Sequence, residues 1–152
     1  MLKIRVKIEN GQAGGAHIRH IIDRAPLAAK RGLRRIIRGL HREADDFLAG
    51  AAGKPGSYPV PSITGHLRRN LDWLEPGEKK TVNGVSFDTD DLEAMLFDSA
   101  IYASVIHDGT RSSESHGPRP FTDDALDAFN TGGRIEGIMA AEFKKELERT
   151  GI

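Results

Sequence analysis

Apolar and charged residues alternate at the start of the chain. The apolar side chains occupy every second position, at Leu2, Ile4, Val6 and Ile8. Alternation over eight residues is typical of a strand that buries one of its faces. The glycine-rich stretch "NGQAGG" then breaks the pattern. We therefore expect a half-buried strand at residues 2–8.

A helical pattern follows. Apolar residues recur every three or four positions, at Ile18, Ile22, Ala25, Ala29, Leu33, Ile36, Leu40, Ala44 and Phe47. This spacing predicts one long amphipathic helix, with Gly50 as a plausible stop. Pro26 removes a backbone hydrogen bond, so we expect a kink or break near it. The apolar register continues across Pro26, which favours one bent helix over two.

The middle of the chain predicts short extended segments. "LDWLEPGEKKTVNGVSF" contains two such segments around "EPGE" and a further turn at "NG". "SITGHLRRNL" predicts either a short helix or the start of a strand. "DTDDLEAML" fits a short helix and a strand equally well, and the sequence leaves this open.

The last third of the chain predicts two helices. In "FTDDALDAFN", Thr122 is a candidate N-cap with acids in the first turn after it. "TGG" interrupts this helix. A second apolar stripe then follows at Ile135, Ile138, Met139, Phe143 and Leu147.

Length and composition indicate one domain, residues 1–152, with flexible loops near 50–62 and 109–119. The chain has no cysteine, which excludes disulfides, thiolate nucleophiles and cysteine-ligated zinc. The first residues lack the apolar core of a signal peptide, and no apolar run approaches the ~20 residues that span a bilayer.

Charge is distributed unevenly. Residues 1–80 hold 16 Lys and Arg against 8 Asp and Glu, whereas residues 81–152 hold 6 against 14. The halves either neutralise each other within one fold or offer opposite patches for head-to-tail association.

The most basic feature of the chain is a row of arginines in the long helix. No acidic residue occurs between positions 24 and 42. Opposite the apolar stripe, helical spacing aligns the candidate contact face Arg31, Arg35, Arg38 and Arg42. Such a row is a solvated face, a contact for an acidic protein surface, or a nucleic-acid contact. No aromatic residue is interleaved for base stacking.

Candidate catalytic groups are weak. His17 and His20 share a helix face without a third metal ligand at a recognised spacing, and His107-Asp108 lacks a nucleophile elbow. Asp72, Glu78 and Lys80 can be arranged as a nuclease-like magnesium site, although Glu78 lies in a predicted turn. We therefore expect no enzyme, no catalytic or metal-binding residues and no cofactor.

Three segments in order resemble a known family. They are "TGHLRRNL" at 64–71, "YASVIHDGT" at 102–110 and "PRPF" at 118–121. This order resembles the tail-completion, or head–tail joining, family of tailed bacteriophages and prophages. The matching residues are Gly65, Leu67, Arg68, Tyr102, Ala103, His107, Gly109, Thr110, Pro120 and Phe121.

The resemblance implies an α+β fold, in which a few-stranded antiparallel sheet packs against the long kinked N-terminal helix and a C-terminal helix. It implies a non-enzymatic part of the phage neck or tail top that forms rings through which genome DNA passes. Its partners would be further copies and other head–tail connector or tail proteins, with neither a membrane nor a small-molecule substrate. Its location would be the bacterial cytoplasm during assembly, and then the virion.

Two alternative functions remain open from the residues. One is a nucleic-acid-binding protein that uses the basic helix face, and the other is a metal-dependent nuclease at Asp72, Glu78 and Lys80. In the structural reading, the "HDGT" segment only turns the chain: Gly109 permits the bend and Asp108 suits the turn.

Overall fold

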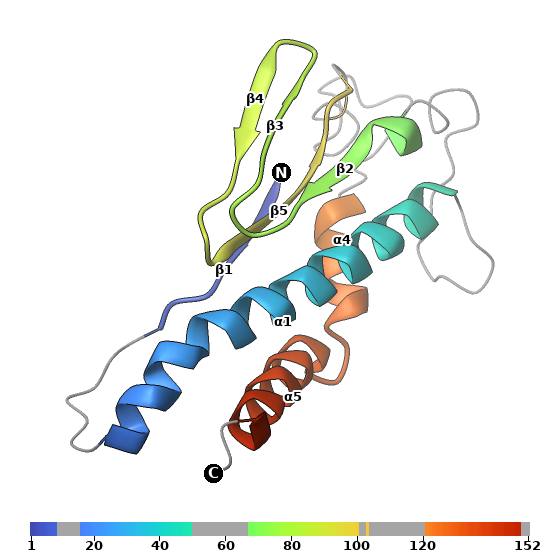
Figure 1. Ribbon diagram of the computed structural model, residues 1–152. Coiled ribbons are helices and arrows are strands. Elements are labelled where there is room, and N and C mark those ends of the chain that lie inside the picture. The colour runs from blue at the N-terminus through green and yellow to red at the C-terminus, as the bar shows by residue number, and fades with distance from the viewer. Residues whose placement is uncertain (9–15, 50–66, 101–102, 104–120, 150–152) are drawn as a thin grey trace.

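The computed structural model describes residues 1–8, 16–49, 67–100, 103 and 121–149, with side chains of the first helix described from Asp23 onward. The elements are, in order, β1 (Leu2–Arg5), α1 (Ala16–Ala49), β2 (Leu71–Leu74), β3 (Lys79–Val82), β4 (Val85–Asp88), β5 (Glu93–Asp98), α4 (Phe121–Phe129) and α5 (Arg134–Arg149). The expected α+β class is confirmed. The sheet lies on one side of α1, and α4 and α5 pack against α1 as well (Figure 1).

The main sheet has three antiparallel strands in the order β1–β5–β2. Leu2 pairs with Leu96, and Leu71 pairs with Asp98. The second half of the segment that the sequence left open between helix and strand, from Glu93 onward, thus belongs to the central strand. Its residues 93–97 are all buried, because one face packs against α1 and the other against a hairpin. A strand buried on both faces shows no alternation, which explains the ambiguity.

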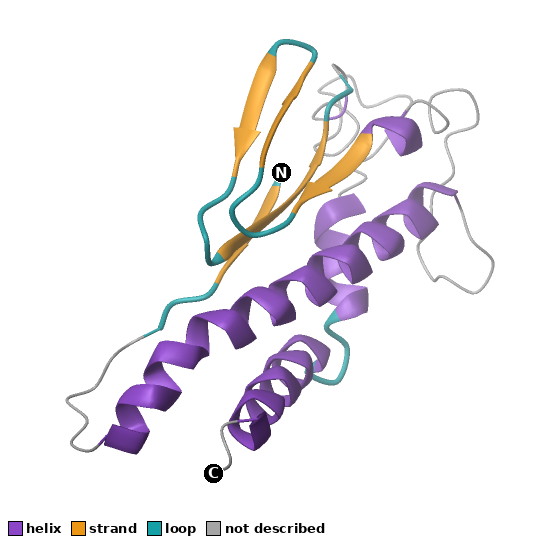
Figure 2. Cartoon of the chain, viewed as in Figure 1, coloured by secondary structure: helices purple, strands orange, loops and turns teal. Residues whose placement is uncertain are grey.

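Strands β3 and β4 form a separate two-stranded hairpin (Figure 2). Asn83 and Gly84 occupy its turn with φ angles of 51° and 77°. Positive φ at both central residues is the geometry that Asn-Gly favours in a two-residue hairpin turn. Phe87 of the hairpin stacks on Phe97 of β5, with ring centroids 4.2 Å apart. The turn predicted at "NG" is confirmed.

Helix α1 is continuous through Pro26, so the alternative of two separate helices is wrong, and the bend expected there stays a prediction. It ends at Ala49, directly before Gly50. The expected stripe is buried from Ala29 to Phe47, and Ile37 and Leu48 are buried beside it. The buried face is wider than one stripe because sheet and helices cover two sides of α1.

Two glycines let the C-terminal helices approach α1 closely. A Cβ atom on Gly39 would overlap the ring of Phe129, and one on Gly32 would overlap the sulfur of Met139. Between α4 and α5, Gly132 and Gly133 have φ angles of 72° and 75°, which glycine adopts without strain. These glycines turn the chain so that α5 returns along α1.

The start of α4 differs from the expectation. The helix begins at Phe121, so Thr122 lies inside the first turn and the assignment of Thr122 as N-cap is wrong. Thr122 is buried, together with Phe121. The helix therefore begins two residues before the position that a cap at Thr122 would give it.

The close contact at Gly39 gives a stability prediction. We expect Gly39→Ala to lower the free energy of unfolding by about 1–3 kcal/mol, because the buried Phe129 ring must move. Gly137 is the matched control: it is exposed in α5, and a Cβ there meets nothing within 4 Å. Gly137→Ala should instead raise stability by up to about 1 kcal/mol through helix propensity. Urea unfolding followed by circular dichroism measures the free energy of unfolding of both variants. If both substitutions stabilised the protein equally, the close contact between position 39 and the Phe129 ring would be contradicted.

Candidate interaction surface on helix α1

The outward side of α1 carries a continuous row of arginines, which we call the arginine ridge: Arg24, Arg31, Arg34, Arg35, Arg38 and Arg42. Their long side chains lie between the sheet on one flank of α1 and α5 on the other. The exposed side-chain fraction reaches 63% at Arg38. The row expected from the sequence therefore lies at the surface and is exposed at Arg35, Arg38 and Arg42, whereas Arg31 is half-buried.

On one flank of the ridge, α5 contributes two carboxylates that are almost fully buried. Glu142 and Glu146 are each 4% exposed. Arg35 Nη1 donates to Glu142 at 2.7 Å, and Arg31 Nε donates to the same carboxylate at 3.2 Å. Arg31 Nη2 also donates to Glu146, which Arg24 approaches at 3.3 Å. The ridge thus holds α5 through shared carboxylates.

On the other flank, a single carboxylate from the β2–β3 turn serves two arginines. Arg38 Nε donates to Glu75 at 2.7 Å, and Arg34 Nε lies 3.3 Å from its second oxygen. The Glu75 side chain is 15% exposed. The sheet and α5 therefore both attach to α1 through charge.

These contacts shift the acid–base equilibria of the groups involved. The hydrogen bond from Arg35 lowers the pKa of Glu142, and the hydrogen bond from Arg31 lowers the pKa of Glu146, in each case against the opposing effect of burial. The same contact with Glu146 raises the pKa of Arg31. Both carboxylates are consequently ionised at neutral pH and stabilise the docked position of α5.

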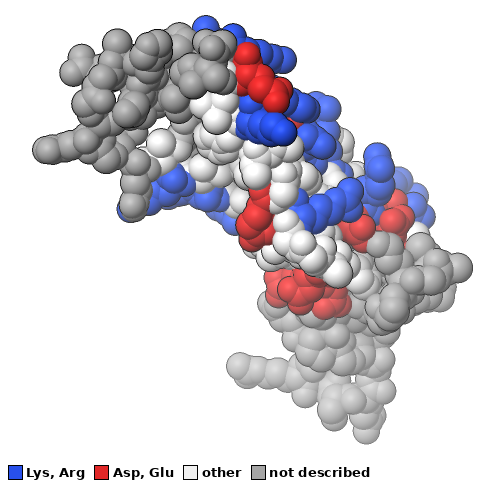
Figure 3. All heavy atoms as spheres, turned by 90° about the horizontal axis from the view of Figure 1, so that it is seen from below, with Lys and Arg blue, Asp and Glu red and all other residues white. Residues whose placement is uncertain are grey.

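Cations outnumber carboxylates around the ridge. Lys145 and Arg149 of α5 also approach Glu142 and Glu146, at 3.4 and 3.9 Å. Seven cations therefore share three carboxylates. Arg42 is exposed and has no ion-pair partner among the described residues. In Figure 3, basic side chains cover more of the described surface than acidic ones on the face seen from below. The ridge keeps a positive surplus after internal pairing.

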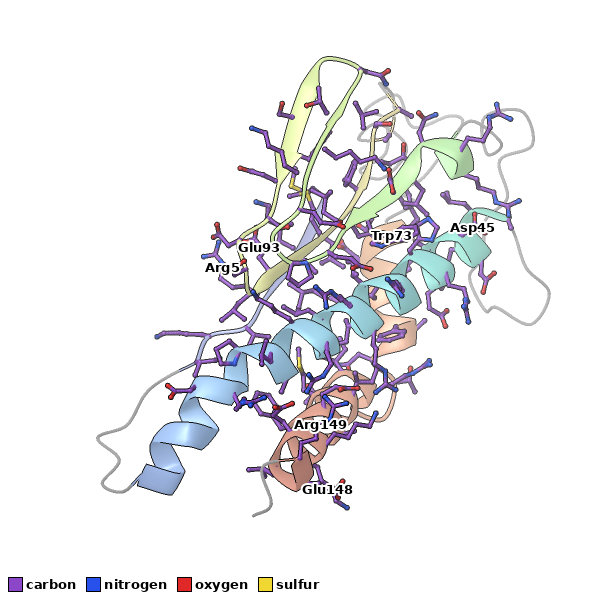
Figure 4. All side chains as sticks on the ribbon, in the orientation of Figure 1. Arg5, Asp45, Trp73, Glu93, Glu148 and Arg149 are labelled. Atoms are coloured by element: carbon purple, nitrogen blue, oxygen red, sulfur yellow. The ribbon has the colours of Figure 1, made fainter. Side chains whose placement is uncertain are left out.

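A second charged contact joins β1 to β5. Arg5 Nη2 donates to Glu93 at 2.6 Å, directly across the strand pair, and Lys3 lies 3.5 Å from the other oxygen (Figure 4). The hydrogen bond from Arg5 lowers the pKa of Glu93. With Lys30–Asp91 at 3.4 Å, the basic first half and the acidic second half pair within one molecule. The first of the two charge hypotheses is thus confirmed for these residues.

The structure brings together one described residue from each of the three family-like segments. Leu67, Ala103 and Phe121 are buried in one core cluster, at 0%, 8% and 2% exposure, beside the C-terminal half of α1. Arg68 donates two hydrogen bonds, of 2.8 and 3.0 Å, to the carboxylate of Asp45. The remaining matched residues lie outside the described residues: Gly65, Tyr102, His107, Gly109, Thr110 and Pro120. So do the loops expected near 50–62 and 109–119.

The three residues of the nuclease hypothesis are only partly together. Lys80 Nζ, on β3 of the hairpin, contacts Asp72 Oδ2, on β2 of the main sheet. Glu78 instead accepts a hydrogen bond of 2.8 Å from the backbone N–H of Glu75. In the described part of the chain, no three His, Cys, Asp or Glu side chains come together as metal ligands would. His17 and His20 belong to α1, but their side chains are not among those described, and His107 is outside the described residues.

Sequence reasoning missed the acidic partners of the ridge. Glu142 and Glu146 follow Ile135 and Met139 at helical spacing, so the inward face of α5 ends in two carboxylates. Leu147, expected on that face, is 37% exposed and this expectation is wrong. The signal was present: an apolar stripe continued by acids in one helix, and an acid-free arginine row in another.

Asp98 was also missed. It ends β5, where Oδ1 accepts a hydrogen bond of 2.9 Å from the N–H of Ala100. Oδ2 is buried, and no described residue donates to it. Burial raises the pKa of Asp98 to about 6. In the sequence, Asp98 precedes the start of the family-like segment at 102–110 by four residues.

Comparison with known proteins finds no matching family model, no matching curated protein and no matching solved structure. The resemblance to phage head–tail joining proteins therefore stays a prediction from the residues. Within the described ranges, none of the helices is both long enough and apolar enough to cross a bilayer.

The lowered pKa of Glu142 predicts a pH-dependent contribution to stability. A folded-state pKa below the unfolded value of ~4.3 stabilises the fold above that pH, and this contribution is lost as the pH falls through the folded value. We expect the difference in Tm between wild type and Glu142→Gln to be largest near neutral pH and to shrink below about pH 4.3. Thermal melts across this range measure it. Glu148→Gln, at an exposed position without an ion pair in the described structure, is the control and should show no such trend.

Asp98 predicts the opposite trend. Its folded-state pKa of about 6 lies above the unfolded value of ~3.9, so the charged form weakens the fold. As the pH falls from about 7 to 5, wild type should gain Tm relative to Asp98→Asn, because only wild type takes up a proton there. The exposed Asp88→Asn provides the control. A constant difference across this pH range would contradict the assignment.

Proposed function

We propose that this protein is a non-enzymatic structural component of tailed-phage or prophage particles, which forms rings at the head–tail junction or tail top. One observation supports the proposal most directly. Three segments that are far apart in the sequence and resemble the head–tail joining family each place a residue in the same core cluster. These are Leu67, Ala103 and Phe121, and residues that share a core specify a common scaffold.

The charge distribution supports assembly with other copies. The arginine ridge keeps a positive surplus on the exposed side of α1, while exposed acids occur on α4 and on the β4–β5 connection. Opposite surfaces on one molecule favour heterologous contacts, which close into rings when the rotation between neighbours permits. In this role the ridge and the core motifs act through shape and charge.

The nucleic-acid alternative has one supporting observation, the positive surplus of the ridge. Three of its four proposed contact residues, Arg31, Arg35 and Arg38, already bind carboxylates of the same chain. A shift assay with duplex DNA at low salt tests this function, and binding that weakens steeply with salt would favour it over ring formation.

Ring formation is tested on the intact protein. Native mass spectrometry and electron microscopy should show a closed oligomer, either of the protein alone or after mixing with any connector and tail-tube proteins that are found encoded beside its gene. In an inducible prophage, deletion of the gene should yield filled heads and separate tails. A protein that stays monomeric in every mixture, with normal particles from the deletion strain, would refute the proposal.

A further inference from the structure

We propose that the exposed part of the arginine ridge, formed by Arg34, Arg38 and Arg42, docks the acidic face of helix α4 from a second copy of this chain. The inference rests on the proposed function and identifies the contact between neighbouring copies. It follows from the charge surplus, from an internal example of the same contact, and from the geometry of α4.

The chain itself shows how the ridge binds an acidic helix. Glu142 and Glu146 stand one helical turn apart on α5, and together they contact Arg24, Arg31 and Arg35. Arginines spaced by a turn or two on one helix thus match carboxylates spaced by one turn on another. The match uses charge-assisted hydrogen bonds, which are the stronger kind.

The ridge continues beyond the region that α5 occupies. Arg34 and Arg38 share the single carboxylate of Glu75, and their side chains are 47% and 63% exposed. Arg42, one turn further on, is exposed without an ion pair to the described residues. Guanidinium groups held in place by a partly buried carboxylate lose little side-chain entropy when a further anion binds. This end of the ridge is therefore a preformed, positively charged surface that can bind an anionic group.

Helix α4 presents the same acidic spacing as α5. Its inward face consists of Phe121, Ala125 and Phe129, all buried. Asp123 and Asp127 lie on the opposite face, exposed and one turn apart, as Glu142 and Glu146 are. Charge complementarity and matched spacing thus identify α4 of another copy as the occupant of the ridge.

The two surfaces point in different directions. Phe129 attaches α4 to α1 at Gly39, so the aspartates on the opposite face of α4 lie away from α1, whereas Arg38 and Arg42 are exposed on α1 itself. Each copy then offers its ridge to one neighbour and its α4 to another. Such a head-to-tail contact repeats, and it produces a ring or a chain of copies.

The test uses two complementary variants. The ridge variant combines Arg42→Glu with Arg38→Gln, which leaves Arg34 to pair with Glu75. The acid variant combines Asp127→Asn with Asp123→Asn, so that it offers no new positive charge to the reversed ridge. Lys79→Glu is the control, because Lys79 is exposed on β3 of the hairpin and makes no ion pair with the described residues. Circular dichroism and thermal melts establish that each variant folds.

Sedimentation velocity at low salt should show association of wild type and of the Lys79→Glu control, and strong weakening at high salt. Each complementary variant alone should be monomeric. An equimolar mixture should form one-to-one dimers and nothing larger, because only the ridge of the acid variant and the α4 of the ridge variant remain compatible. The mixed dimer is the decisive result, since misfolded variants cannot produce it.

Several outcomes overturn the inference. Wild type that is monomeric at low salt, or a mixture that stays monomeric, excludes the contact. If both variants form oligomers normally, the ridge–α4 interface is refuted, whereas the proposed function as a ring-forming protein is not. If the ridge variant loses binding to a duplex DNA probe while self-association is unchanged in both variants, the ridge binds nucleic acid instead.

Discussion

The fold depends on the arginines of α1 meeting carboxylates that would otherwise be buried without compensation. Glu142 and Glu146 are almost fully covered by α5 and α1, and an ionised carboxylate in such a place is costly unless it is paired and hydrogen-bonded. Arg31 binds both of them. Helix α1 is therefore both the central wall of the core and the main counter-charge for α5, and removing its arginines would leave Glu142 and Glu146 only the more distant Lys145 and Arg149 of their own helix.

Local patterns predicted the elements whose structure local rules decide. Alternation identified β1, and the helical stripe identified α1 without fixing the width of its buried face. The Asn83-Gly84 turn follows from the φ angles that these residues tolerate. Strand β5 was ambiguous because burial on both faces removes the period that distinguishes a strand from a helix. Thr122 and Leu147 were misplaced where packing, not local preference, decides.

The candidate site was only half visible in the sequence. The arginine row is conspicuous because no acid interrupts it, and its helical spacing was recognised. Its partners on α5 lie more than a hundred residues away, and nothing local links Arg35 to Glu142. Only the topology, with the Gly132-Gly133 turn bringing α5 back along α1, places them together. The same applies to Asp98, whose raised pKa comes from burial at the end of a central strand.

The β3–β4 hairpin stands outside the main sheet and packs on it through a small second cluster, which includes the stacked rings of Phe87 and Phe97. Its tip, at Asn83 and Gly84, is exposed and makes no contribution to the larger core cluster. A residue change at this tip therefore leaves the larger core cluster untouched, provided that the turn keeps residues that tolerate positive φ. In an assembly of many proteins, the tip of this hairpin can change its contacts with a neighbour without changing the main core. The same property makes it a suitable position for attaching a fluorophore.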